Sequence, residues 1–227
     1  MFQDELDRAD ALMQAGEVEA ALCLLERLVA QIEKEIGHDS EALIKPLGML
    51  AHALGRRNRP RDLSAEEEAV RKRSLLISDR VNGELSEVSS SICRMLAVVL
   101  SLNGRHLEAN EYMTRVLAFM ESTRKPGFSL ASDIRMVGDN LLELGQFEEA
   151  AVQYRRALTV LGVADGARLR CFLNYGMGRA LLALGQGSEA HQYFAQALAV
   201  WSRRDGPQSR FSVELRQQMD RAKRLSN

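Results

Sequence analysis

The sequence is poor in proline and aromatic residues, and it has no long apolar run. Only four of its 227 residues are proline, and apolar residues seldom alternate strictly with polar ones, so helix is favoured over strand almost everywhere. No stretch approaches the roughly 18 consecutive apolar residues of a membrane-spanning helix. We therefore expect an all-α, soluble chain.

The chain also lacks an excess of either charge. Thirty basic side chains stand against 31 acidic ones, which gives a net charge of -1, so no overall field attracts nucleic acid or an anionic membrane. Many of the seven Phe, four Tyr and one Trp residues occupy helical core positions, which argues against an aromatic platform for single-stranded nucleic acid. We expect neither nucleic-acid binding nor membrane insertion.

Cysteine is scarce and shows no pairing pattern. Cys23, Cys93 and Cys171 are odd in number, widely spaced and set in helical apolar patterns, which predicts reduced core thiols rather than disulfides or metal ligands. The first residues, MFQDELDRAD, show neither the basic region nor the apolar stretch of a secretory signal. Both observations predict a cytoplasmic protein.

Glycines that follow a leucine-rich helical stretch recur along the chain. They are Gly16, Gly55, Gly104, Gly145 and Gly185, with spacings of 39, 49, 41 and 40 residues. An alanine stands five residues after each glycine except Gly55, whose counterpart is interpreted as Ala69. This alignment predicts a nine-residue insertion within RRNRPRDLS and five repeats of about 40 residues.

Each repeat contains two helical halves. In the fourth repeat Ile134, Gly138 and Leu141 share one face of the first half, and Ala150 and Tyr154 share one face of the second. The glycine between the halves can adopt the left-handed conformation that ends a helix, which predicts an antiparallel hairpin. Small residues where the two helices cross, including Gly138 and the Gly176-Met177-Gly178 segment, predict close packing.

The segments LLELGQFEEAAVQYRRAL and LLALGQGSEAHQYFAQAL resemble tetratricopeptide repeats. Their small residue, turn glycine and alanine and aromatic positions carry the resemblance, although Gly187 replaces the aromatic residue after the fifth turn. The 40-residue period resembles the longer repeats of kinesin light chains and related bacterial proteins. The resemblance covers about residues 2–203 and implies a right-handed superhelical solenoid of helix-turn-helix repeats.

The whole chain, residues 1–227, is predicted to be one solenoid. Its repeats are placed at about 2–39, 40–84, 85–127, 128–165 and 166–205, followed by a capping helix at 208–225 whose apolar face would contain Phe211, Leu215, Met219 and Ala222 and would cover Trp201. Lys45-Pro46 predicts a kink or a late helix start. Ser64 and Glu67 form a capping box that predicts where the second helix of repeat two begins.

No catalytic or metal-binding pattern is present. The histidines are isolated, and no phosphate-binding loop, dinucleotide fingerprint or nucleophile elbow occurs. Glu66-Glu67-Glu68 and Glu148-Glu149 stand on predicted first helical turns, where the helix dipole favours acids. We predict no metal, no cofactor and no enzymatic activity.

A solenoid of this kind presents its first helices on a concave face. Ten residues before the turn glycines of repeats two to four stand Lys45, Arg94 and Arg135, which resemble the basic members of the carboxylate clamp found in peptide-binding members of the family. The predicted peptide groove consists of Lys45, Met49, His52, Arg94, Arg135, Asp139, Tyr175 and Arg179.

The leading functional hypothesis is a protein-protein interaction module that binds a partner segment, acidic or C-terminal, in this groove. The alternative is a solvated face whose charges have no binding role. The methionines on or beside this face could equally well fill the core. Two other functions stay open, a self-assembling structural scaffold and a regulatory or sensor subunit of a larger complex. The Arg56–Arg61 run is interpreted as a solvated loop, with phosphate contact as the alternative.

Overall fold

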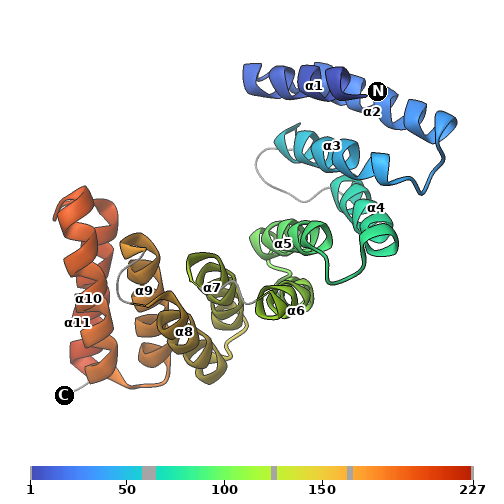
Figure 1. Cartoon of the computed structure of the whole chain (residues 1–227). Coiled ribbons are helices and arrows are strands. Elements are labelled where there is room, and N and C mark those ends of the chain that lie inside the picture. The colour runs from blue at the N-terminus through green and yellow to red at the C-terminus, as the bar shows by residue number, and fades with distance from the viewer. Residues whose placement is uncertain (1, 58–64, 124–126, 163–165, 226–227) are drawn as a thin grey trace. The chain divides into compact units, whose positions relative to one another are not determined.

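The computed structural model describes residues 2–57, 65–123, 127–162 and 166–225. These residues form eleven α-helices and one short 3-10 helix, and no strand occurs among them (Figure 1). The all-α prediction is confirmed. No helix in the described ranges is both long and apolar enough to cross a membrane.

The chain divides into two compact units, Met1–Phe119 and Met120–Asn227. Unit 1 contains α1 Gln3–Ala15, α2 Val18–Glu35, η1 Glu41–Leu43, α3 Ile44–Arg57, α4 Ala65–Asn82, α5 Glu87–Leu102 and most of α6 His106–Ser122. Unit 2 contains α7 Phe128–Glu143, α8 Phe147–Leu161, α9 Ala167–Ala183, α10 Gly187–Asp205 and α11 Arg210–Leu225.

Helices that follow one another in the chain pack against one another. The pairs α1 with α2, α3 with α4, α7 with α8 and α9 with α10 form hairpins, and α3, α5, α9 and α11 each pack on the helix before them. Each unit is therefore a stack of helical hairpins. The repeat boundaries and the assignment of residues 1–227 to one solenoid stay predictions.

Four of the five predicted turn glycines lie at hairpin turns. Gly16 has a φ of 82°, and Gly104, Gly145 and Gly185 each have a φ of 75°, a conformation that side chains other than glycine's rarely adopt. The prediction of a turn at Gly55 is wrong, since α3 continues through this residue to Arg57. A Cβ atom at Gly55 would lie 2.9 Å from the Glu67 carboxylate, so the glycine makes room for that side chain.

The second helix of each hairpin buries residues at positions i, i+4 and i+7. These are Ala21, Leu25 and Leu28 in α2, Ala109, Met113 and Val116 in α6, Ala150, Tyr154 and Ala157 in α8, and Ala190, Phe194 and Ala197 in α10. The buried alanines confirm that a small residue is needed five positions after the turn glycine.

In α4 the same buried positions are polar. They are occupied by Glu67, Arg71 and Ser74, whereas Ala69 is exposed. The alignment of Gly55 with Ala69 is therefore wrong by two residues. Glu67 stands twelve residues after Gly55 instead of five, so the insertion is seven residues long, not nine.

Glycines allow α8 to approach α7 and α9 closely, and α10 to approach α9. A Cβ atom at Gly176 would lie 2.4 Å from Tyr154 Cζ, and one at Gly138 would lie 3.0 Å from the same ring. At Gly178 a Cβ atom would lie 2.6 Å from Phe194 Cε1. Since both aromatic side chains are fully buried, the prediction of close packing at these glycines is confirmed.

The predicted late start of α3 is also confirmed. The 3-10 helix η1 precedes it, and Pro46 is the third residue of α3, within the first turn, where backbone N–H groups have no partner inside the helix. The Ser40 hydroxyl accepts a hydrogen bond of 3.2 Å from the Ala42 amide and caps η1. Ser64, the predicted cap of α4, lies outside the described residues.

Helix α11 packs on α10, as its pattern predicted. Leu215 and Ala222 are fully buried, and the Phe211 ring lies 4.9 Å from that of Trp201 and 5.0 Å from that of Tyr175, measured between centroids. The prediction that Trp201 packs under this helix is correct. An aromatic cluster therefore joins α9, α10 and α11.

The cysteines are all free thiols, but they do not all lie in the core. Cys93 and Cys171 are buried, and burial raises the pKa of each thiol to about 11. Cys23 is exposed on α2, so the core prediction is wrong for this residue. It occupies the outer side of α2, away from the buried positions Leu22 and Leu25.

A cluster of charges joins α4 to α6. The Glu68 carboxylate pairs with Arg105 Nη1 and with Lys72 Nζ, each at 2.5 Å, and Arg105 also pairs with Glu108. The hydrogen bonds from Arg105 outweigh desolvation and lower the pKa of Glu68 to about 2. Glu68 is therefore charged in the folded protein at all but strongly acidic pH.

We expect this cluster to stabilise the fold except in acid. Because the folded pKa of Glu68 is depressed, its contribution is complete above the unfolded value of 4.5 and is lost as pH falls towards about 2. Glu68→Gln should cost about 1–2 kcal/mol of unfolding free energy at pH 7 and much less near pH 2. Urea unfolding at several pH values measures the difference. A constant difference between the two proteins across this range would contradict the assignment.

Candidate functional site

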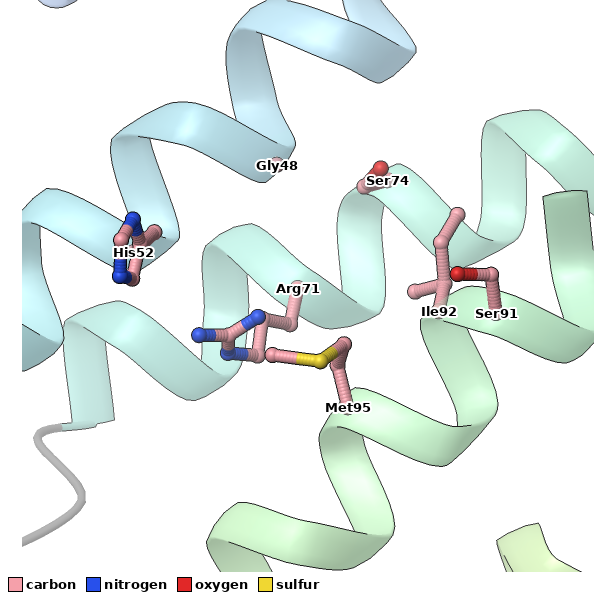
Figure 2. Close-up of a pocket in the computed structure, with 7 residues that line it drawn as sticks. All are labelled: Gly48, His52, Arg71, Ser74, Ser91, Ile92 and Met95. Carbon is pink, nitrogen blue, oxygen red and sulfur yellow. The ribbon is translucent and has the colours of Figure 1, made fainter. Parts of the chain in front are cut away.

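A pocket of about 190 Å³ opens in unit 1 between α3, α4 and α5. Figure 2 shows its lining: Gly48 and His52 from α3, Arg71 and Ser74 from α4, and Ser91, Ile92 and Met95 from α5. Helix α4 packs against both α3 and α5, so its side chains form the floor between them. The walls combine apolar groups, hydroxyls and one guanidinium.

The floor consists of polar residues at positions that are apolar in the other described hairpins. Arg71 is only 6% exposed and takes the place of Tyr154 or Phe194 in unit 2, while Ser74 takes the place of an alanine. Arg71 Nε and Nη2 both donate to Glu67 Oε1, at 3.0 and 2.8 Å. A buried ion pair is costly compared with apolar packing, and such a departure from the packing rule is characteristic of functional positions.

The serine hydroxyls on the same buried face of α4 also form hydrogen bonds within the chain. Ser74 Oγ donates to the Ile44 carbonyl at 3.3 Å, and Ser78 Oγ lies 2.8 Å from Ser89 Oγ. These bonds fix α4 against the start of α3 and the start of α5. The pocket is therefore held by polar contacts as well as by apolar packing.

Gly48 leaves the mouth of the pocket open. It stands seven residues before Gly55, as Gly138 and Gly178 stand seven before their turn glycines. Unlike those two, a Cβ atom at Gly48 would meet nothing within 4 Å. The space that aromatic side chains fill in unit 2 is thus unfilled beside Gly48.

The structure places the predicted groove residues of unit 1 on two helices. Lys45, Met49 and His52 lie on one face of α3, with Lys45 and His52 exposed, and Lys45 Nζ reaches Gln3 Oε1 of α1 at 3.5 Å. Of these residues and Arg94 of α5, only His52 lines the pocket. Arg94 lies on a different side of α5 from Ile92 and Met95.

The four predicted residues of unit 2 are engaged with neighbours. Arg135 pairs with Asp139, which also accepts a 2.7 Å hydrogen bond from the Tyr154 hydroxyl. Arg179 pairs with Glu143 at 3.1 Å, and the Tyr175 hydroxyl donates to Glu214 of α11. The two arginines are therefore each neutralised by an acid of the same unit.

Burial sets the protonation of this network. Desolvation raises the pKa of Asp139 despite its ion pair with Arg135, and it raises the pKa of Tyr154, helped by the adjacent carboxylate. Desolvation and the bond to Glu214 raise the pKa of Tyr175 to about 12. Both tyrosines therefore stay hydrogen-bond donors at neutral pH.

Sequence reasoning missed Arg71, Ser74 and Glu67. The available signal was a polar series at Glu67, Arg71, Ser74 and Ser78, with spacing i, i+4, i+7 and i+11, which matches the buried stripe of the other second helices. The misplaced insertion concealed it. Within the described residues no group of three or more His, Cys, Asp or Glu side chains could hold a metal ion.

The comparisons with known proteins agree with this fold. Residues 176–204 match the family model described as Tetratricopeptide repeat. No curated protein matches the chain in a sequence search.

Solved structures resemble nearly the whole chain. The putative kinesin light chain TPR-like repeats of Podosopora anserina give a TM-score of 0.74 at 20% identity, covering 90% of this chain and 96% of that one. BtubC (BKLC) from P. vanneervenii gives 0.72 at 20% identity, covering 87% and 78%. The Rap protein complexed with Competence and Sporulation Factor gives 0.54 at 14% identity, covering 99% and 77%. The predicted resemblance to long-period tetratricopeptide repeats is thus confirmed for the fold.

Proposed function

We propose that this TPR-like repeat protein is an interaction module that binds a segment of a partner protein, and that the pocket of unit 1 receives one carboxylate-bearing residue of that segment. The observation that carries the proposal is the buried Arg71, which replaces an apolar core residue and lines an open pocket. A solved structure of similar fold, the Rap protein, is complexed with Competence and Sporulation Factor, which supports partner binding by this architecture.

The chemistry of the pocket favours an acidic residue next to an apolar one. Arg71 contributes a guanidinium whose orientation is fixed by Glu67, and a preorganised guanidinium suits a carboxylate. Lys45 and His52 lie on the same face of α3, one on each side of Gly48, and no acid lines the pocket. Ile92 and Met95 offer an apolar wall for the neighbouring side chain.

This placement moves the proposed site away from the other basic residues of the predicted groove, Arg94, Arg135 and Arg179. Arg135 and Arg179 are paired with Asp139 and Glu143, as Arg71 is paired with Glu67, and what favours Arg71 is that it lines an open pocket. We propose that Lys45 contributes long-range attraction and that Arg71 contributes the directed contact, with His52 beside it in the pocket wall. The remaining groove residues, Met49, Arg94 and Tyr175, stay candidate contacts along the segment.

Filling the pocket should weaken binding without harming the fold. Gly48→Phe would project a ring into the open space, whereas the matched variant Gly48→Ala adds one methyl group that meets no atom within 4 Å. Short random peptides displayed with free C-termini would be selected on the wild-type protein. The affinities of the selected peptides for all three proteins would then be measured by calorimetry.

We expect the selected peptides to carry Asp, Glu or a terminal carboxylate next to an apolar residue. Peptides with an amidated C-terminus separate the last of these sources from the first two. Gly48→Phe should weaken their binding at least tenfold, about 1.4 kcal/mol, and Gly48→Ala should bind like wild type. Basic or purely apolar peptides, or equal affinity for Gly48→Phe, would refute the pocket as the site.

The protein is proposed to act by binding alone, without catalysis, cofactor or metal, in the cytoplasm. The free thiols of Cys93 and Cys171 are consistent with a reducing compartment. A role as a regulatory subunit fits the same site, since it requires partner binding as well.

A further inference from the structure

We propose that two copies of this chain associate through the exposed face of α1 on one copy and the exposed face of α11 on the other. The two helices belong to different units, and each has one face buried against its own neighbours. The inference concerns the opposite faces, and it is independent of the peptide site proposed above.

The exposed face of α1 consists of Asp4, Asp7, Arg8, Ala11 and Ala15, all of them exposed. At 3.6 residues per turn these positions fall within an arc of about 100°. Leu6, Ala9 and Met13 form the buried face on the other side of the helix. The Asp7 carboxylate accepts a hydrogen bond from the neutral Gln3 amide of the same helix, which leaves its charge in place.

The exposed face of α11 consists of Val213, Gln217, Asp220, Arg221 and Arg224, again all exposed. These positions also fall within an arc of about 100°, opposite the fully buried Leu215 and Ala222. The helix as a whole is basic, whereas α1 is acidic. The basic residues of α11 are Arg210, Arg216, Arg221, Lys223 and Arg224, and its acidic residues are Glu214 and Asp220.

In one antiparallel register, each residue of the α1 face lies opposite a compatible residue of the α11 face. When Asp4 is set beside Arg224, Asp7 falls beside Arg221 and Arg8 beside Asp220. All three pairs have opposite charges, including the pair in which the signs are exchanged. In the same register Ala11 faces Gln217 and Ala15 faces Val213, so the two alanines of α1 allow close approach where no charges meet.

Neighbouring registers are disfavoured by the same residues. Shifting α11 by one helical turn in one direction sets Asp4 beside Asp220, and shifting it in the other sets Arg8 beside Arg224. Either shift brings like charges together. The single reversed pair, Arg8 with Asp220, therefore selects a register, which a uniformly acidic face against a uniformly basic one would not do.

The contact joins two different surfaces and is therefore heterologous. Each copy that docks its α1 still presents its α11, so association closes into a reciprocal dimer or a ring, or extends as an open chain. Because the contact is small and rich in exposed ion pairs, it should be weak and should weaken further at high salt.

Charge exchange tests the register directly. In one variant Asp4→Lys and Asp7→Lys make the α1 face basic, and in another Arg221→Glu and Arg224→Glu make the α11 face acidic. The control variant, Glu148→Lys with Glu149→Lys, makes the same change of charge on exposed positions of α8. Sedimentation equilibrium of the full chain at low and high salt gives the association constant of each protein and of mixtures.

We expect the wild-type and control proteins to associate at low salt, and each face variant alone to associate at least tenfold more weakly. Mixing the two face variants should restore association, because each basic α1 then meets an acidic α11 and each acidic α1 meets a basic α11. A wild-type protein that stays monomeric at low salt would overturn the proposal. Face variants that associate like the wild type, or a mixture that fails to recover, would also overturn it.

Discussion

Replacing Gly176 with alanine should destabilise unit 2 by about 1–2 kcal/mol. The new Cβ atom would lie 2.4 Å from Tyr154 Cζ and 2.7 Å from its hydroxyl oxygen. Tyr154 is fully buried and hydrogen-bonded to Asp139, so the ring cannot withdraw without breaking that bond. Overpacking of this kind costs about 1–3 kcal/mol and exceeds the gain in helix propensity from alanine, about 1 kcal/mol.

Urea unfolding measured by tryptophan fluorescence suits this test, because the one Trp in the sequence, Trp201, lies in unit 2. Gly48→Ala is the matched control, since it makes the same substitution in a helix where the methyl group meets no neighbour. It should stabilise unit 1 by about 0.5–1 kcal/mol, read by circular dichroism, and should leave the Trp201 transition of unit 2 unchanged. A Gly176→Ala protein as stable as the wild type would show that close helix approach is not required there.

Replacing Leu215 with aspartate should release α11 from α10. Leu215 is fully buried, and the nearby Phe211 ring packs edge-on against Trp201. An unpaired carboxylate in this position must either stay neutral or bring water into the interface, at a cost of about 3 kcal/mol or more. The emission of Trp201 should shift to longer wavelength as its covering helix leaves.

Gln217→Asp provides the control for α11, because this residue is exposed on the same helix. It introduces the same charge and should leave the emission of Trp201 unchanged. If Leu215→Asp also kept the wild-type emission and stability, α11 would contribute little to covering unit 2.

The hairpin architecture could be predicted because its signals are local. Gly145 and Gly185 end helices through their own backbone conformation, and the alanines five residues later must be small because a neighbouring helix crosses there. Such requirements depend on a few adjacent residues and recur at a fixed spacing. They are therefore visible in the sequence before any contact is known.

The second hairpin departs from the pattern, and there sequence reasoning failed. Gly55 looks like a turn glycine, but it lies inside α3, where the Glu67 carboxylate occupies the space beside it. Arg71 looks like a surface residue, because a Glu and an Arg four residues apart are common on exposed helix faces and do not by themselves indicate burial. Pairing between buried charges depends on three-dimensional contacts and is poorly encoded in single residue types.

The predicted groove shows the same limit. The positions of Lys45, Arg135 and Arg179 on the first helices follow from helical periodicity. Whether each cation is available to a ligand depends on its neighbours. Arg135 and Arg179 are paired with acids of unit 2, which a count of cations at one level of the solenoid does not reveal.

The exposure of Cys23 provides a labelling site for energy-transfer measurements without any substitution. Thiol reagents act on accessible thiolates, so a dye would attach to Cys23 in preference to Cys93 and Cys171, which are buried with raised pKa values. Trp201, the natural donor for energy transfer, lies in unit 2, whereas Cys23 lies in unit 1. Energy transfer between tryptophan and dye would therefore follow changes in the separation of the two units when a partner binds.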